Sequence, residues 1–133
     1  MTDLPQVHPT RRVRTPTGEI IQVDVGMADL VQALWAKGYT TLMCCQDAGE
    51  AIRGGATRIP PERWERYAAF YDGFAWLTMP VADMQRLVAL TAHLAEGNGW
   101  APNIRIRPTG PTEFASLHFP ARQIDEVIGR LDV

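Results

Sequence analysis

The sequence predicts an α+β fold with a ferredoxin-like, split βαβ (βαββαβ) order of elements, and three observations support this prediction. Segments of alternating apolar and polar residues recur along the chain, each followed by apolar residues at helical spacing or by a turn. The resulting order is β-α-β, an insert, β-α-β and an extra C-terminal strand-helix unit. The length of 133 residues corresponds to about one domain. We expect one mixed sheet with the helices mainly on one face.

The first part of the chain predicts a hairpin, a helix and a further strand. Residues 11–14 can pair with the alternating segment 19–25, because the residues between them favour a turn. Apolar residues then recur at helical spacing between Met27 and Trp35. Residues 39–45 are rich in strand-forming residues, which predicts the next strand.

The termini and the insert define the expected domain organisation. We expect residues 1–10 to be a flexible N-terminal segment and residues 11–133 to form a single domain. Within it, residues 46–73 are an insert that consists of a polar, glycine-bearing loop (46–60) and a short helix (61–71). The apolar stripe of that helix consists of Trp64, Tyr67, Ala68 and Tyr71.

The second half predicts two similar strand-to-helix corners. Residues 74–79 and 114–119 both alternate in polarity, and each segment ends in a proline that can open a helix. The first of these helices ends before Gly99. Residues 103–107 also alternate, and the short turn before Phe114 makes them a hairpin partner of the last strand.

The alternation assigns side chains to the two faces of the sheet. The helix-covered face should carry Ile21, Val23, Val25, Ala75, Leu77, Met79, Ile104, Ile106, Ala115, Leu117 and Phe119. The opposite face should carry Gln22, Asp24, Phe74, Trp76, Thr78, Arg105, Arg107, Phe114, Ser116 and His118. In residues 39–45, either Thr41, Met43 and Cys45 or Leu42 and Cys44 join this second face.

Composition excludes several classes of protein. Thirteen basic and fifteen acidic residues give a formal net charge of -2, which disfavours a strongly basic nucleic-acid binder. The only two cysteines are neighbours and cannot close a loop, so we expect a reducing, cytoplasmic environment. The chain has no apolar run of about 18 residues and no secretory signal pattern, so we expect no membrane segment.

The second face of the sheet motivates our leading functional hypothesis. It combines aromatic rings, arginines and a histidine without a recognisable catalytic constellation, which favours a non-enzymatic binding module for a protein partner or a small ligand. The candidate binding residues are Trp76, Arg105, Arg107 and His118 on this face and Gln46 and Asp47 in the adjoining loop, residues 46–60. Two alternatives stay open: the inserted helix covers this face, or the face forms a homodimer.

A thiol-dependent enzyme is the alternative from another class. Cys44 or Cys45 would be the nucleophile, with His118 as its base and Asp24 in support. The structural alternative is that one cysteine lies in the core and its neighbour faces the far side of the sheet.

Metal and phosphate chemistry have less support. The cysteines and histidines show neither C-x-x-C nor H-x-x-x-H spacing, so we expect no metal site and no cofactor. A third alternative is a phosphate or nucleic-acid binder, whose contacts would come from Arg11, Arg12, Arg14, Arg105 and Arg107. For the three N-terminal arginines, a solvated hairpin edge is the favoured explanation.

Four short motifs carry a resemblance to a known group of proteins. They are Val23-Asp24-Val25-Gly26, Leu34-Trp35, Thr41-Leu42-Met43-Cys44-Cys45-Gln46 and Phe119-Pro120. Together they resemble small uncharacterised proteins of actinobacteria and actinobacterial phages, a group with no established activity. This chain departs from them by having Cys44 where a serine is usual and by an extra segment near residues 53–73. The resemblance implies an accessory protein of that source.

Overall fold

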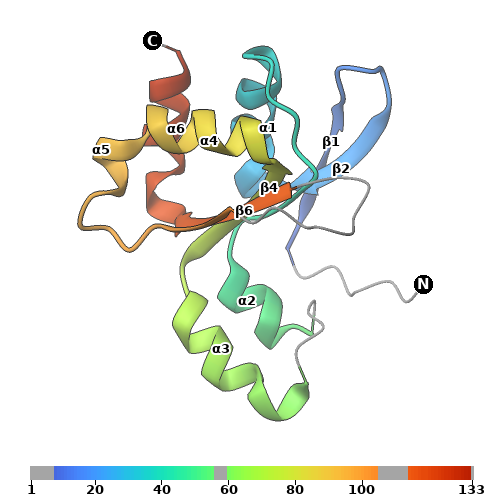
Figure 1. Cartoon of the computed structure of the whole chain (residues 1–133). Helices are drawn as coiled ribbons and strands as arrows, with labels where there is room; N and C mark the ends of the chain where they lie inside the picture. The colour runs from blue at the N-terminus through green and yellow to red at the C-terminus, as the bar shows by residue number, and fades with distance from the viewer. Residues whose placement is uncertain (1–7, 56–59, 105–113, 133) are drawn as a thin grey trace.

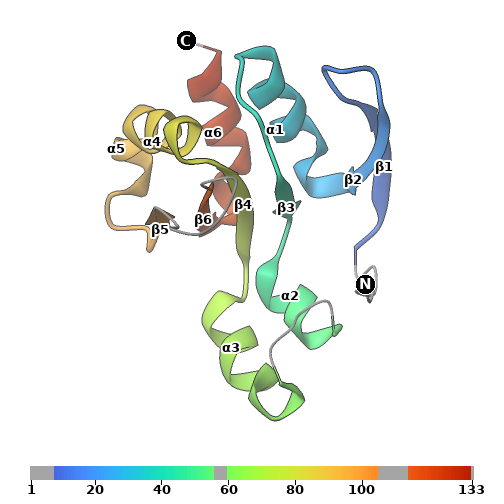
Figure 2. The ribbon, with the colours of Figure 1, turned by 45° about the vertical axis from the view of Figure 1, so that its right-hand side comes forward.

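The chain folds into antiparallel sheets of two and four strands with helices packed against them (Figure 1). The computed structural model describes residues 8–55, 60–104 and 114–132. Figures 1 and 2 show helices gathered on one side of the four-stranded sheet, while the helices between β3 and β4 lie beyond the end of its strands. The α+β class predicted from the sequence is therefore confirmed.

The two-stranded sheet is the expected N-terminal hairpin. Strand β1 (Thr10–Arg14) pairs antiparallel with β2 (Ile20–Asp24), and Arg12 faces Gln22 in the register. Gly18 has a φ of 91°, a left-handed conformation that glycine adopts without a steric cost and that this turn requires.

The larger sheet has the strand order β3-β4-β6-β5, and every neighbouring pair in it is antiparallel. Its strands are β3 (Met43–Cys45), β4 (Phe74–Pro80), β6 (Phe114–Pro120) and β5 (Ala101–Ile104). The predicted mixed sheet is wrong for the described residues. The chain leaves β3 and re-enters β4 at the same end of the sheet, and this return makes the two strands antiparallel.

The predicted place of segment 19–25 is also wrong, and with it the ferredoxin-like order of the first six elements. This segment was expected in the main sheet, but β2 is hydrogen-bonded in a sheet of its own with β1. Strand β3 is shorter than residues 39–45, since only Met43–Cys45 pair with β4.

The core lies between the main sheet and three helices, α1 (Val25–Ala36), α4 (Val81–Leu90) and α6 (Ile124–Leu131). The expected inward side chains of β4 and β6 are all buried, and so is Val23. Those six side chains are Ala75, Leu77, Met79, Ala115, Leu117 and Phe119. Ile106 and the side chain of Ile104 lie outside the described residues.

Two expected core residues are exposed instead. Ile21 is 37% exposed because β2 projects with the hairpin, and Val25 is 49% exposed because it starts α1 rather than ending a strand. The long helix expected after Pro80 divides at Thr91, whose hydroxyl donates to the Leu87 carbonyl, and the short α5 (Ala92–Ala95) follows. A 3-10 turn, η2 (Ala121–Gln123), leads into α6.

The insert forms a pair of helices rather than a loop and one helix. Helix α2 (Ala48–Arg53) lies where a loop was predicted, and η1 (Pro61–Arg63) leads into α3 (Trp64–Tyr71). Helices α2 and α3 pack on each other beyond the end of β4 (Figure 1), and α3 meets the second face of the sheet at its last residue, Tyr71, whose ring stacks on that of His118. Among the described residues, no helix combines the length and apolar character needed to span a bilayer.

Candidate functional site

His8 lies buried between two carboxylates, although it precedes the first strand. Its side chain is 5% exposed. Nδ1 lies 3.2 Å from Asp24 Oδ2, and Nε2 lies 3.1 Å from Glu50 Oε2. The expectation of a flexible segment over residues 1–10 is therefore wrong for His8, while residues 1–7 lie outside the described residues.

Three elements bring the partners of His8 together, and we call His8, Asp24, Cys45 and Glu50 the His8 cluster. Asp24 ends β2, Cys45 ends β3 and Glu50 lies on α2. Cys45 Sγ lies 3.9 Å from His8 Nδ1 and donates to the Asp47 carbonyl at 3.3 Å. The cluster thus forms where the ends of the two sheets meet.

Gln46 joins the ends of β2 and β3 and holds Asp24 in place. Its backbone N–H donates to Asp24 Oδ2 at 3.0 Å, and its side-chain oxygen accepts from the Gly26 N–H at 2.8 Å. A Cβ at Gly26 would lie 2.7 Å from that oxygen, so any side chain at this position would displace the Gln46 amide. The sequence predicted Gln46 as a binding residue, and in the structure its backbone supports Asp24 of the His8 cluster.

Asp47, another predicted binding residue, uses both carboxylate oxygens within the fold. Oδ1 accepts the Glu50 N–H at 3.0 Å and caps α2, while Oδ2 accepts the Gly73 N–H at 3.1 Å. Both bonds tie the helix pair to the start of β4. Asp47 therefore caps the helix that carries Glu50 and helps to position it.

The two cysteines have different surroundings. Cys44 packs against the core, and burial with the nearby Asp24 carboxylate raises the pKa of its thiol to about 12. Burial also raises the pKa of Cys45 to about 11. A thiol nucleophile needs a lowered pKa, so these surroundings oppose the chemistry of the thiol-enzyme alternative.

The sheet also separates the proposed nucleophile from its proposed base. Cys45, Trp76 and His118 occupy one row across β3, β4 and β6. Two strand spacings, about 10 Å, therefore lie between the backbones of Cys45 and His118. Cys45 is adjacent to His8 instead, which the sequence had not indicated.

Four rings form a continuous series from α3 to β4, and we call Phe70, Tyr71, His118 and Trp76 the aromatic ladder. The Phe70 and Tyr71 ring centroids lie 4.8 Å apart, edge to face. Tyr71 stacks on His118 at 4.3 Å, and His118 lies 6.2 Å from Trp76. Phe70 is 71% exposed, whereas the other three rings are half-buried. Thus Trp76 and His118, both predicted, share one surface.

Of the arginines that the sequence analysis singles out, the structure describes those of the N-terminal hairpin. Arg105 and Arg107 lie outside the described residues. Arg11 donates to Asp29 and Gln32 at 2.9 Å, and Arg14 donates to the Gly18 carbonyl at 3.0 Å. These contacts fit the solvated hairpin edge.

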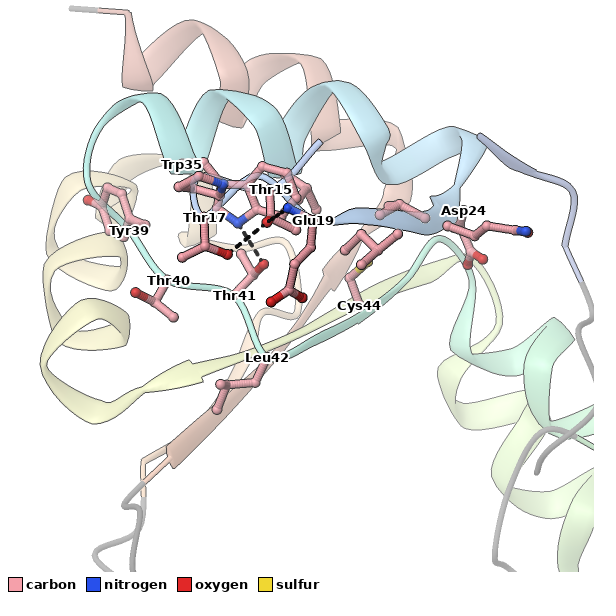
Figure 3. Close-up of a pocket in the computed structure, with 15 residues that line it drawn as sticks. Thr15, Thr17, Glu19, Asp24, Trp35, Tyr39, Thr40, Thr41, Leu42 and Cys44 are labelled. Atoms are coloured by element: carbon pink, nitrogen blue, oxygen red, sulfur yellow. Dashed lines mark hydrogen bonds between the residues drawn. The ribbon is translucent and has the colours of Figure 1, made fainter. Parts of the chain in front are cut away.

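A groove of about 450 Å³ lies between the β1–β2 hairpin and the segment before β3 (Figure 3). Trp35 borders it and donates to the Thr41 hydroxyl at 3.0 Å. Leu42, 45% exposed, lies along it, and Asp24 lies near one end. Cys44 lines the groove, whereas Cys45 is paired with Trp76 of the ladder. Neighbouring residues of a strand point to opposite faces, so the groove lies on the opposite side of β3 from the aromatic ladder.

The pKa of His118 predicts a dependence of stability on pH. Burial lowers this pKa from 6.5 to about 4, so between these values the unfolded chain binds a proton that the folded chain does not. The contribution of the neutral His118 ring to the free energy of unfolding is complete above pH 6.5. It is lost progressively as the pH falls from 6.5 through 4. On acidification, the free energy of unfolding should fall by about 1–2 kcal/mol more in the wild type than in His118→Gln. The difference is this small because the ring is partly exposed.

Urea unfolding of the two proteins at about pH 7.5 and about pH 4.5 measures this difference. Protonation of the carboxylates destabilises both proteins equally, so it cancels when the two losses are compared. An identical loss in the wild type and in His118→Gln would show that the His118 ring titrates as it does in the unfolded chain.

Comparisons of the chain with protein-family models, with curated proteins and with solved structures found no match in any of the three.

Proposed function

We propose that this protein is a non-enzymatic binding module that takes a peptide segment of a protein partner on its aromatic ladder. The observation that carries the proposal is the unbroken contact of Phe70, Tyr71, His118 and Trp76, with Phe70 71% exposed at its outer end. Aromatic rings of this kind supply most of the binding energy in many protein interfaces.

The ladder offers an apolar surface that is already organised before binding. Tyr71 is held against His118 by stacking at 4.3 Å, and His118 sits on a strand paired on both sides. With its pKa lowered to about 4, His118 is neutral near pH 7 and adds no charge to the surface. Little side-chain freedom is therefore lost when a partner covers these rings.

Charged groups of both signs surround the helix that carries Phe70. Asp72 follows Tyr71 and is 56% exposed, and Glu65 on the same helix is 82% exposed. Arg53 pairs with both of them, at 3.0 Å and 3.2 Å. Because Arg53 pairs with both carboxylates and the exposed Arg66 lies one helical turn before Phe70, the apolar rings, rather than a net charge, select a segment that presents an apolar side chain.

The source and compartment of the module belong to the same proposal. Cys44 and Cys45 are both free thiols, which fits a reducing cytoplasm. The resemblance to small proteins of actinobacteria and their phages favours an accessory role, in which the module recognises another protein of that source.

A displayed library of random peptides tests this function. Peptides selected on the wild-type chain should lose about tenfold or more in affinity for Phe70→Ala, because one aromatic anchor contributes more than 1 kcal/mol. The matched control is Leu42→Ala, which removes another exposed apolar side chain from the groove and should leave the affinity unchanged.

Two results would contradict the proposal. One is a selection that enriches no peptide, and the other is a set of peptides that lose affinity for Leu42→Ala but not for Phe70→Ala. The second result would place the binding site in the groove. A molecular mass that doubles with concentration in the wild type but not in Phe70→Ala would identify a second copy of the chain as the occupant.

A further inference from the structure

We propose that His8, Asp24 and Cys45 form a binding site for a divalent transition-metal ion of the zinc class. Each residue offers one ligand atom, and the three atoms lie within 4.8 Å of one another. The three residues are far apart in the sequence, and the fold brings them together where β2, β3 and the segment before β1 meet. This inference is independent of the aromatic ladder.

The distances between the ligand atoms are close to those around a tetrahedral zinc ion. Bond lengths of about 2.0–2.1 Å to nitrogen and oxygen and about 2.3 Å to sulfur place nitrogen about 3.3 Å from oxygen and about 3.6 Å from sulfur. Here His8 Nδ1 lies 3.2 Å from Asp24 Oδ2 and 3.9 Å from Cys45 Sγ. The third pair, the Asp24 carboxylate and Cys45 Sγ, lies within 4.8 Å, against about 3.6 Å in a tetrahedral site, so side-chain shifts of up to about 1 Å close the site.

A second observation, the orientation of the His8 ring, supports the same conclusion. Glu50 Oε2 lies 3.1 Å from Nε2, on the far side of the ring from Asp24 and Cys45. With Glu50 as the acceptor at Nε2–H, a metal ion takes the place of the proton between Nδ1 and Asp24 Oδ2, and that proton goes to solvent. Most metal-binding histidines have such a partner, so Glu50 is a positioning residue here.

The remaining ligands are also held in place. Asp24 is 17% exposed, and its Oδ2 accepts the Gln46 N–H at 3.0 Å. Cys45 ends a strand that is paired with β4, so its backbone is fixed relative to the sheet. Binding therefore requires little ordering of the protein.

The mixed donor set selects the class of metal. A thiolate and an imidazole are ligands for zinc and similar ions, whereas magnesium and calcium prefer oxygen ligands alone. The Cys45 thiol gives its proton to solvent as the metal–sulfur bond forms. One thiolate and one carboxylate then balance the charge of a divalent ion, and the fourth tetrahedral position is left for water or a ligand atom.

Titration of the full, tag-free chain with cobalt(II) tests the proposal, because cobalt reports tetrahedral sulfur coordination in its absorption spectrum. We expect a thiolate-to-cobalt charge-transfer band at a stoichiometry of one ion, and we expect zinc to abolish it. Cys45→Ser should remove the band, while the matched control Cys44→Ala should retain it. Glu50→Gln should weaken zinc binding about 10–100-fold without removing the band.

A second measurement covers the case in which a variant does not fold. In the wild-type chain, zinc should slow the alkylation of Cys45 at least tenfold more than that of Cys44, as read from the fragment ions of the peptide that carries both thiols. The proposal would be overturned by the absence of the charge-transfer band, by a band that Cys45→Ser retains, or by equal protection of both thiols.

Discussion

Replacing Phe119 by alanine should lower the free energy of unfolding by about 3–5 kcal/mol, a large part of the total stability of a domain of this size. Phe119 is 1% exposed, and its ring lies 5.1 Å from that of Trp100. The substitution removes buried apolar surface and leaves a cavity that the paired strands on both sides cannot close. Denaturant unfolding followed by circular dichroism measures the change.

Phe70→Ala is the matched control, because it makes the same chemical change at a side chain that is 71% exposed. We expect it to change the free energy of unfolding by less than about 0.5 kcal/mol. The same variant should still lose affinity for the selected peptides, which separates the binding role of Phe70 from any role in stability. Similar losses of stability in both variants would contradict the assignment of Phe119 to the core.

The second large effect is expected from Gly49→Ala in α2. A Cβ at this position would lie 2.6 Å from the Asp72 Cα and 2.7 Å from the Ala68 carbonyl oxygen. Both atoms belong to the backbone of the neighbouring segment, so the helix pair has to move apart. We expect a loss of about 1–3 kcal/mol in the free energy of unfolding.

The consequences of Gly49→Ala extend to both sites, because α2 carries Glu50 and α3 carries Phe70. Gly129→Ala in α6 is the control: nothing lies within 4 Å of its Cβ position, and alanine favours the helix. We expect it to raise the stability by about 0.5–1 kcal/mol. If the two alanine variants had the same stability, the close approach of α2 and α3 would be refuted.

The parts of the fold that could be predicted are those that local patterns determine. Strands β4 and β6 alternate over seven residues each, and their buried faces follow directly from that period. The direction of neighbouring strands depends instead on where the chain re-enters the sheet. The helix pair of the insert sets that direction, so alternation alone could not exclude the mixed sheet.

Helix α2 was missed although a local signal was present. Asp47 precedes the helix and Glu50 follows three residues later, which is the spacing of an N-terminal capping pair. With six residues in the helix, its apolar stripe was too short to be recognised. The capping signal would have been enough to place Glu50 on a helix rather than in a loop.

The two sites differ in how far the sequence could predict them. Trp76 and His118 share a face because both follow the period of their strands, whereas Phe70 was missed because it lies outside the apolar stripe of its helix. The His8 cluster joins residues 8, 24, 45 and 50, which have no characteristic spacing. Such a cluster arises only from tertiary structure, so a search for metal motifs could not detect it.

The most direct test of the proposed function is the pattern of amide chemical-shift changes when a selected peptide is added to the ¹⁵N-labelled chain. Binding on the aromatic ladder predicts the largest changes at the amides of Phe70, Tyr71 and His118 and at the indole N–H of Trp76. The amides of Thr15, Thr41 and Leu42 in the groove should stay unchanged. Changes confined to the groove, with none on the ladder, would contradict the proposed function.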